Sequence, residues 1–156
     1  MSELVIRKAN LTDMGEIEKL LVAVFAGEQG IPADDVACLD GTNHQWGCAA
    51  LDGESADGQI VGAVASWETD GETHWGRFAV NPRWRGQHIG TRLAAQSFHD
   101  LFSQGVEVIH MTAREQTVKI VCGMGGKVTG AAEPFFKGTV TPVVIEKGEF
   151  VWQDGI

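Results

Sequence analysis

The chain has 156 residues and a formal net charge of −9, with 12 Lys and Arg against 21 Asp and Glu. That length can bury one sizeable core without disulfides or metal ions, so we expect a single domain over residues 1–156. The negative charge disfavours binding to the phosphate backbone of nucleic acids. The amino terminus lacks the pattern of a secretory leader, and no apolar stretch approaches the roughly 20 residues that span a bilayer. A soluble, cytoplasmic protein that binds no membrane is predicted.

The first half of the chain alternates a strand, a helix and three further strands. Thr12 is the predicted helix cap, because hydroxyl side chains accept hydrogen bonds from the first turn. Apolar residues at spacings of three and four then predict an amphipathic helix that ends near Gly27 or Gly30. Asp70 and Gly71 form a hairpin signal between the last two strands. The predicted strands of this half are Leu4–Lys8, Gln45–Leu51, Gln59–Trp67 and Glu72–Val80.

The second half continues with a helix, a strand, a short helix and a final pair of strands. The first of these helices is predicted to close at Gly105 in a left-handed cap. Glycines at 123, 125 and 126 end the second helix. This order of elements predicts an α+β fold with one mixed sheet. The predicted elements are a helix over 89–102, strand Val106–Ala113, helix Glu115–Cys122, a strand at Val128 and strand Val140–Ile145.

The cysteines give no sign of a metal site. Cys38, Cys48 and Cys122 are odd in number and lack the paired close spacing of zinc ligands. We interpret them as reduced small hydrophobic residues, which is how free cysteines commonly pack. A catalytic thiol is the alternative interpretation.

The turn between the fourth strand and the following helix is the segment most indicative of function. It reads RGQHIG, from Arg85 to Gly90. A glycine-bearing turn that leads into a helix amino terminus presents unpaired backbone N–H donors and the positive end of the helix dipole. Such a turn is an anion site and can hold a diphosphate.

This turn resembles the phosphate turn of the GCN5-related N-acetyltransferase (GNAT) superfamily, and the resemblance covers the chain from Val5 to about Ile145. The family's turn runs Arg or Gln, two residues, Gly, one residue, then Gly or Ala. Arg85, Ile89 and Gly90 match this pattern, and His88 replaces the first glycine. Further residues resemble a bacterial subgroup with an EQGIP signature after the first helix, whose acceptors are mostly unassigned. They are Val24, Phe25, Glu28, Gln29, Gly30, Ile31, Pro32, Asp40, His44, Val61 and Gly62.

The resemblance implies a mixed, mostly antiparallel central sheet of about six to seven strands, flanked by helices and splayed between the fourth and fifth strands. It also implies acetyl-coenzyme A as co-substrate, with backbone amides of 87–91 on the diphosphate. The pantetheine arm would pair with residues 78–80, as an amide-rich chain can with a free strand edge. The implied cofactor-binding residues are Phe78, Ala79, Val80, Arg85, Gly86, Gln87, His88, Ile89, Gly90 and Thr91.

Two positions depart from the family's pattern. Histidine tolerates positive φ better than most residues, so His88 either contacts a phosphate oxygen or is an exposed, tolerated substitution. The family's tyrosine, which protonates the departing thiolate, aligns with Val121, and the chain contains no tyrosine. A thiol with a pKa of about 8.5 can leave as its anion, so an enzymic acid is helpful but not obligatory. Cys122, beside this position, is interpreted as structural.

The implied reaction is direct attack of a primary amine on the thioester in a ternary complex, with an unidentified small molecule or peptide as acceptor. Deprotonating a lysine-like amine at pH 7 costs roughly 4 to 5 kcal/mol, so a base is useful. Candidate bases are Glu28, in the signature loop, and His74 or Glu72, on the fourth strand; each has a structural alternative. Trp67 and Trp75 are interpreted as core residues, with the lining of an acceptor pocket as the alternative.

Two other functions stay open. A degenerate GNAT could bind acyl-CoA as a sensor or an interaction module, a reading favoured by His88 and by the missing tyrosine. An acyltransferase could instead use a longer acyl-CoA. A homodimer is a further open arrangement.

Overall fold

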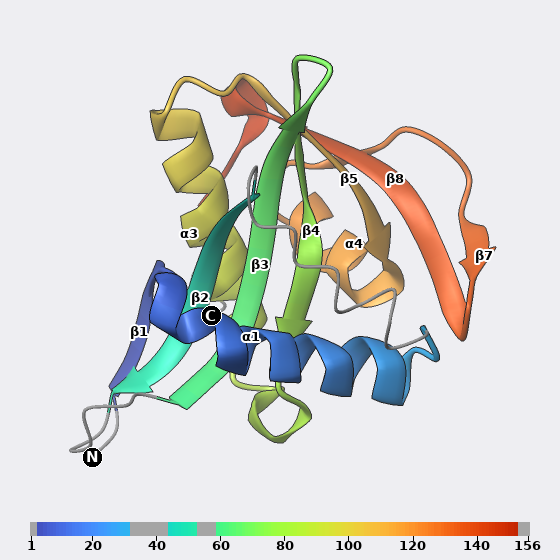
Figure 1. Cartoon of the computed structure of the whole chain (residues 1–156). Coiled ribbons are helices and arrows are strands. Elements are labelled where there is room, and N and C mark those ends of the chain that lie inside the picture. The colour runs from blue at the N-terminus through green and yellow to red at the C-terminus, as the bar shows by residue number, and fades with distance from the viewer. Residues whose placement is uncertain (1–2, 32–43, 53–58, 153–156) are drawn as a thin grey trace.

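The computed structural model describes residues 3–31, 44–52 and 59–152 (Figure 1). Its helical segments are α1 (Met14–Leu21), the π-helical η2 (Val22–Glu28) that continues it, α3 (Ile89–Ser103) and α4 (Glu115–Cys122), with short 3-10 turns η1 (Leu11–Asp13), η3 (Pro82–Trp84) and η4 (Lys147–Glu149). Its strands are β1 (Glu3–Lys8), β2 (His44–Asp52), β3 (Gln59–Thr69), β4 (Glu72–Val80), β5 (Val108–Arg114), β6 (Lys127–Val128), β7 (Glu133–Phe135) and β8 (Gly138–Glu146).

The described strands form one eight-stranded sheet, in the order β1-β2-β3-β4-β5-β8-β6, with β7 pairing with β8. Every pair is antiparallel except β4 and β5, which run parallel. The predicted mixed, mostly antiparallel sheet is therefore confirmed. Parallel neighbours need a crossover connection, and α3 supplies it between β4 and β5.

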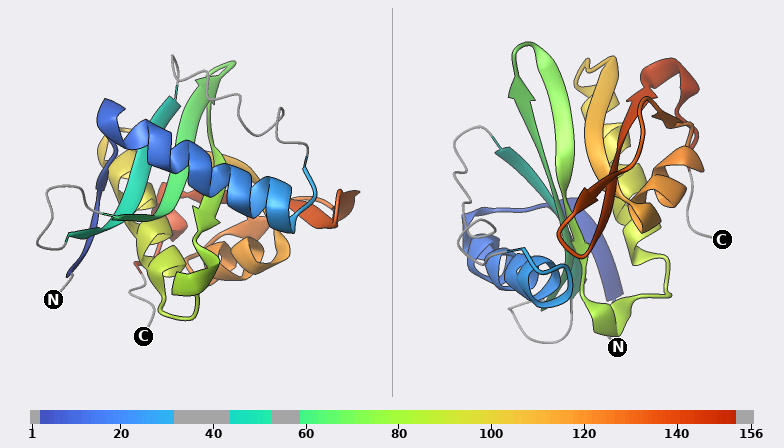
Figure 2. Two further views of the ribbon diagram at one scale, coloured as in Figure 1. Left: turned by 60° about the horizontal axis from the view of Figure 1, so that its bottom comes forward. Right: turned by 90° about the vertical axis from the view of Figure 1, so that its right-hand side faces the viewer.

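Helices cover both faces of the sheet. Figure 2 shows α1 with η2 on one side and α3 with α4 on the other. On the first face, Ile17, Leu21 and Val24 pack against β2 and β3; on the second, a larger core gathers around Phe98 and Leu93 of α3. The centre of β3 is buried along most of its length, because it is covered from both sides. None of the described helices has the length and apolar character needed to cross a bilayer.

The predicted elements agree closely with the structure. Strand Glu72–Val80 and helix Glu115–Cys122 have the predicted bounds. Gly105 has a φ of +101°, as the predicted left-handed cap requires. Strand β7 was not predicted, because its three residues are all exposed and show no alternation of burial. Cys48 is buried and Cys122 half-buried, in keeping with structural roles, whereas Cys38 lies outside the described residues.

The start of the first helix differs from the prediction. Asn10, rather than Thr12, is the cap: its Oδ1 accepts from the Thr12 amide (3.0 Å), while Asp13 Oδ2 accepts from the Asn10 amide (2.8 Å). This reciprocal pair satisfies two donors at once, which a single threonine cap cannot do. Arg7 donates to both carboxylate oxygens of Asp13, at 2.7 and 3.0 Å, and these bonds hold the pKa of that carboxyl below its usual range.

Candidate active site

The sheet opens between β4 and β5. These parallel strands pair only through Thr73 with Ile109 and His74 with His110 within the described sheet. Beyond His74 the strands diverge, with α4 lying past the point where they separate (Figure 1). The predicted splay between the fourth and fifth strands is therefore present, and it leaves the second half of β4 unpaired on the β5 side.

A bulge bends β4 inside this opening. The β3–β4 register shifts between Ala63 and Ala65, and Arg77 has a φ of +51°, in the left-handed region. β4 has one more residue than β3 across this shift, so the side chains on its two sides no longer follow a single in-and-out alternation. Trp75 and Ala79 are four residues apart and would share a face in a regular strand, but they pack into the cores on opposite faces of the sheet. β-bulges often change the direction of side chains in this way beside functional sites.

The turn after β4 adopts the conformation of an anion site. Gly86 and His88 both have left-handed backbones, with φ of +82° and +61°. The first hydrogen bond of α3 joins the Arg92 amide to the His88 carbonyl (3.0 Å), so the amides of 89–91 have no partner within the helix. His88 is exposed and makes no side-chain capping bond, so it does not compete for these amides. Arg85 Nε donates to the Val80 carbonyl (3.2 Å), which holds the turn against the end of the strand.

A cleft of about 540 Å³, here called the donor cleft, runs along the end of β4 to this turn. It brings together all the predicted cofactor-binding residues except Gln87. Gly90 packs close to two side chains of the strand: a Cβ there would lie 3.1 Å from Phe78 Cζ and 3.4 Å from Val80 Cγ2. The remaining wall of the cleft comes from η2, the end of β5, α4 and the start of β8.

A second cavity of about 480 Å³, here called the splay cavity, lies between the diverging strands. The two cavities share four lining residues, and therefore meet. The shared residues are Gln29, Phe78, Arg114 and Thr117. Aromatic side chains form much of the splay cavity, among them Trp67 and Trp75, which also pack against the core. The interpretation of both tryptophans as core residues is confirmed, and their place in an acceptor pocket stays a prediction.

The model of the Acetyltransferase (GNAT) family matches residues 14–121, which include the bulge, the turn and α4. The chain belongs to the GNAT acetyltransferase family. No curated protein sequence matches it at a significant level. GNAT acetyltransferases use acetyl-coenzyme A, so this is the co-substrate. The donor cleft suits it, because the amides of 89–91 are unpaired within the helix and residue 90 has no Cβ to narrow the cleft.

Solved structures support the GNAT fold. Escherichia coli ElaA aligns over 94% of this chain and 100% of its own, with 17% identity and a TM-score of 0.75. An acyl-CoA N-acyltransferase from Pseudomonas aeruginosa aligns over 93% and 99%, with 16% identity and a TM-score of 0.74. An aminoglycoside 6'-N-acetyltransferase complexed with coenzyme A aligns over 91% and 96%, with 15% identity and a TM-score of 0.68.

The candidate bases lie at different places relative to the donor cleft and the splay cavity. Glu28 ends η2, next to Gln29, and its side chain is outside the described part. His74 lines neither cavity: its Nε2 is 3.7 Å from Glu72 Oε2, and its ring stacks near that of Trp67. The same Glu72 oxygen is 3.9 Å from His110 Nε2. His74 and Glu72 therefore form a small polar group outside both cavities.

Val121, which the resemblance aligns with the family's tyrosine, is fully buried. Val121 is 0% exposed, and its Cγ1 would lie 2.7 Å from a Cβ at Gly126. Gly126 therefore packs closely against this side chain. Cys122 packs against the core and lines neither cavity, which agrees with its structural interpretation. The described residues thus place no tyrosine or thiol beside the cleft.

Two residues with no predicted catalytic or cofactor-binding role lie at the junction of the cavities. Arg114, the last residue of β5, donates from Nη1 to the Phe135 carbonyl (2.7 Å), and its guanidinium carbon lies 5.0 Å from the Phe135 ring centroid. The backbone of Gln29 is held in place, because its backbone carbonyl accepts a hydrogen bond from the Lys137 amide (3.1 Å). Gly30, with a φ of +73°, packs under the Lys137 side chain. The end of η2 is thus joined to the β7–β8 hairpin beside the splay. Gln29 could have been found from the signature, whereas nothing local marks Arg114.

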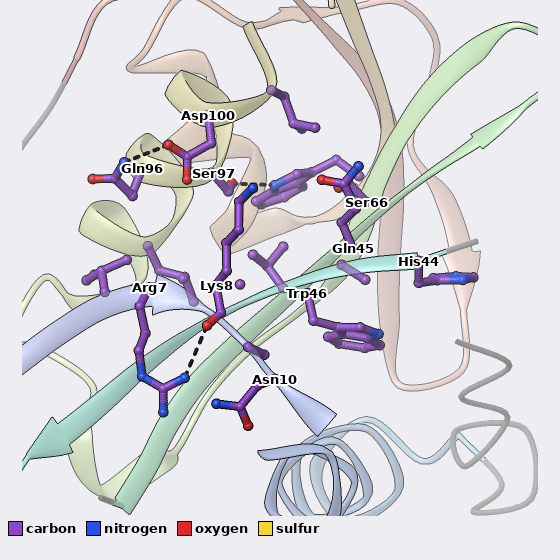
Figure 3. A pocket seen from close by; sticks show the side chains of 18 of the residues that line it. Arg7, Lys8, Asn10, His44, Gln45, Trp46, Ser66, Gln96, Ser97 and Asp100 are labelled. Atoms are coloured by element: carbon purple, nitrogen blue, oxygen red, sulfur yellow. Dashed lines mark hydrogen bonds between the residues drawn. The ribbon is translucent and has the colours of Figure 1, made fainter. Parts of the chain in front are cut away.

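A third cavity, of about 930 Å³, lies between the carboxyl-terminal half of α3 and the ends of β1 and β2 (Figure 3). No predicted catalytic or cofactor-binding residue lines it. Gln96 donates to Asp100 at its rim (2.9 Å), and Trp75 Nε1 donates to Ser97 Oγ (2.7 Å). Trp75 lines both this cavity and the splay cavity.

Proposed function

We propose that the protein transfers an acetyl group from acetyl-CoA to a primary amine of a small molecule or peptide. The observation that carries this proposal is the meeting of the donor cleft and the splay cavity at Phe78. A donor laid along β4 would bring its thioester to this junction, and an acceptor in the splay cavity would approach from the other side. Holding both reactants in one geometry removes much of the entropic barrier to attack.

The reaction proceeds by direct attack. The amine nitrogen forms a bond to the thioester carbonyl carbon, the carbon–sulfur bond breaks, and the thiolate of coenzyme A leaves. A backbone amide of 78–80 stabilises the oxyanion, which is the role that preorganised N–H donors commonly fill. With a pKa of about 8.5, the thiol can leave as its anion without an enzymic acid. The absence of tyrosine from the chain is therefore compatible with turnover.

We assign Glu28 as the base that takes the proton of the acceptor amine. It adjoins Gln29, which lines both cavities, whereas His74 lines neither. Glu28→Gln should lower kcat/KM by roughly 100-fold or more, and activity should recover as the pH rises towards the pKa of the amine. The matched change His74→Gln should leave kcat/KM within about threefold, because this ring lines neither cavity. The reverse order of effects would assign the role to His74.

Acetyl transfer is tested by measuring the release of free thiol from acetyl-CoA in the presence of a panel of primary amines. Mass spectrometry then identifies the acetylated product. Coenzyme A binding is measured by calorimetry alongside. Gly90→Val should weaken that binding at least tenfold, because Phe78 Cζ already lies 3.1 Å from where a Cβ would be. Gly148→Val is the control, since a Cβ there meets nothing within 4 Å. Tight coenzyme A binding without thiol release from any amine would contradict the proposal and support a binding module.

A further inference from the structure

Two buried polar atoms at the junction of the cavities make no hydrogen bond within the described part of the chain. They are Arg114 Nη2, at the end of β5, and Gln29 Oε1, at the end of η2. Both residues line the donor cleft and the splay cavity. Buried polar atoms are nearly always paired, so a donor and an acceptor left unpaired at one junction indicate a ligand that carries the complementary groups.

Arg114 is held in place for such a ligand. Its Nη1 donates to the Phe135 carbonyl and its guanidinium carbon lies near the Phe135 ring, so Nη2 is the nitrogen left without a hydrogen bond among the described residues. Burial lowers the pKa of this group, because the charged form has lost solvent. Arg114 as a whole is half-buried, and its buried Nη2 lacks an acceptor; the two oxygens of a carboxylate match the guanidinium fork.

No described residue accepts a hydrogen bond from Arg114 Nη2, so the complementary anion is assigned to the acceptor. The phosphates of the donor belong at the turn of 85–91, at the far end of the donor cleft, and its thioester end is uncharged. The described side chains that line the splay cavity include Arg77 and Arg114, and none of them is Asp, Glu or His.

The rest of the splay cavity favours an apolar body on the acceptor. Its aromatic lining residues are Phe25, Trp67, Trp75, Phe78, Phe135 and Phe136. Its volume of about 480 Å³ lies within the range of small-molecule sites. Aromatic walls with a few placed polar groups are typical of sites that select one end of a ligand by charge and its body by contact.

We infer that the acceptor is a primary amine that also carries a carboxylate on an apolar or aromatic body, with Arg114 binding the carboxylate and Gln29 accepting an N–H of the amine. The inference rests on the proposed function, because it names the substrate class of the same reaction. Arg114 is a specificity-determining residue under this inference. It contacts the part of the acceptor that does not react.

The experiment compares acceptors that differ only in the carboxylate. The two pairs are phenylalanine with phenethylamine, and para-(aminomethyl)benzoate with benzylamine. Thiol release measures kcat/KM for each acceptor with the unmodified protein. At least one pair should show a preference for the carboxylate of roughly 10- to 100-fold, the range of a hydrogen bond to a charged group. Equal or faster reaction of both plain amines would overturn the inference while leaving acetyl transfer intact.

Variants then locate the preference. Arg114→Gln should bring the ratio within each pair close to one and leave coenzyme A affinity within about threefold. Arg114→Lys should retain part of the ratio, because it keeps the charge but loses the fork. Arg83→Gln is the control, since Arg83 is exposed and lines none of the cavities described. An unchanged ratio in Arg114→Gln, with coenzyme A affinity reduced more than tenfold, would show that the guanidinium serves the donor.

The two proposals fail in different ways. Coenzyme A binding without acetylation of any amine, with or without a carboxylate, would overturn the proposed function and the inference with it. Acetylation without preference for the carboxylate would overturn the inference alone. The comparison in the unmodified protein holds even where an Arg114 variant does not fold.

Discussion

Replacing His88 by glycine tests how the turn holds the donor. His88 is exposed and left-handed, with φ of 61° and ψ of 19°, and makes no capping bond, so truncation removes no packing. A left-handed backbone costs an L-residue roughly 1 to 2 kcal/mol relative to glycine. Glycine in turn loses about 0.5 to 1 kcal/mol more than other residues in chain entropy on folding. These terms nearly cancel, so His88→Gly should change the free energy of unfolding by less than about 1 kcal/mol.

Coenzyme A affinity should fall by no more than roughly tenfold in this variant, or about 1.4 kcal/mol. The physical reason is that the backbone amides of 89–91, rather than the imidazole, hold the diphosphate. His88→Val is the matched contrast, because a β-branched residue tolerates a left-handed backbone poorly and should lose about 1 to 2 kcal/mol of stability.

Urea denaturation measures the stability of both variants, and calorimetry with coenzyme A measures their binding. A loss of affinity beyond tenfold in His88→Gly, at unchanged stability, would show that the imidazole is a required phosphate ligand. A His88→Val variant as stable as the parent would refute the left-handed turn itself.

Two further predictions concern stability. Asp13→Asn should cost about 1 kcal/mol at pH 7, because it breaks the ion pair with Arg7. The pKa of Asp13 is lowered in the folded state, so this contribution to stability is present above about pH 4 and is lost as the pH falls through the folded pKa. Urea denaturation at pH 7 and pH 3 measures the difference in free energy of unfolding between the parent and the variant. An equal difference at both pH values would contradict this prediction. Ser97→Ala should cost about 1 to 3 kcal/mol and lower the Tm by several degrees, because the indole N–H of Trp75, which is 2% exposed, loses its acceptor. Ser103→Ala, on the exposed end of the same helix, should have little effect, and equal shifts in both would refute this reasoning.

Much of the fold was predictable because its signals are local. Strand Glu72–Val80 follows an Asp-Gly hairpin signal, and helix Glu115–Cys122 ends in glycines, so both bounds can be read from neighbouring residues. The turn of 85–90 was predictable for the same reason. Strand β7 was not, because exposed strands held by one partner leave no apolar alternation.

The less predictable features depend on contacts between distant residues. Arginine is an unusual residue in a left-handed backbone, so nothing in the sequence around Arg77 indicated the bulge that separates the faces of Trp75 and Ala79. The role of Arg114 depends on the carbonyl of Phe135, which lies 21 residues further along the chain. The proposed acceptor site therefore became visible only when β5 and the β7–β8 hairpin were placed together.

The short β4–β5 ladder also affects how firmly the two halves of the sheet are joined. Two residue pairs join the β1–β4 half of the described sheet to the half that contains β5–β8, and the helices and loops that span the opening supply the rest of the connection. A donor whose amide arm pairs with β4 would continue the sheet across this seam as a temporary strand. The substrate would then be a structural part of the molecule during turnover, and its departure would return the two halves to a looser joint.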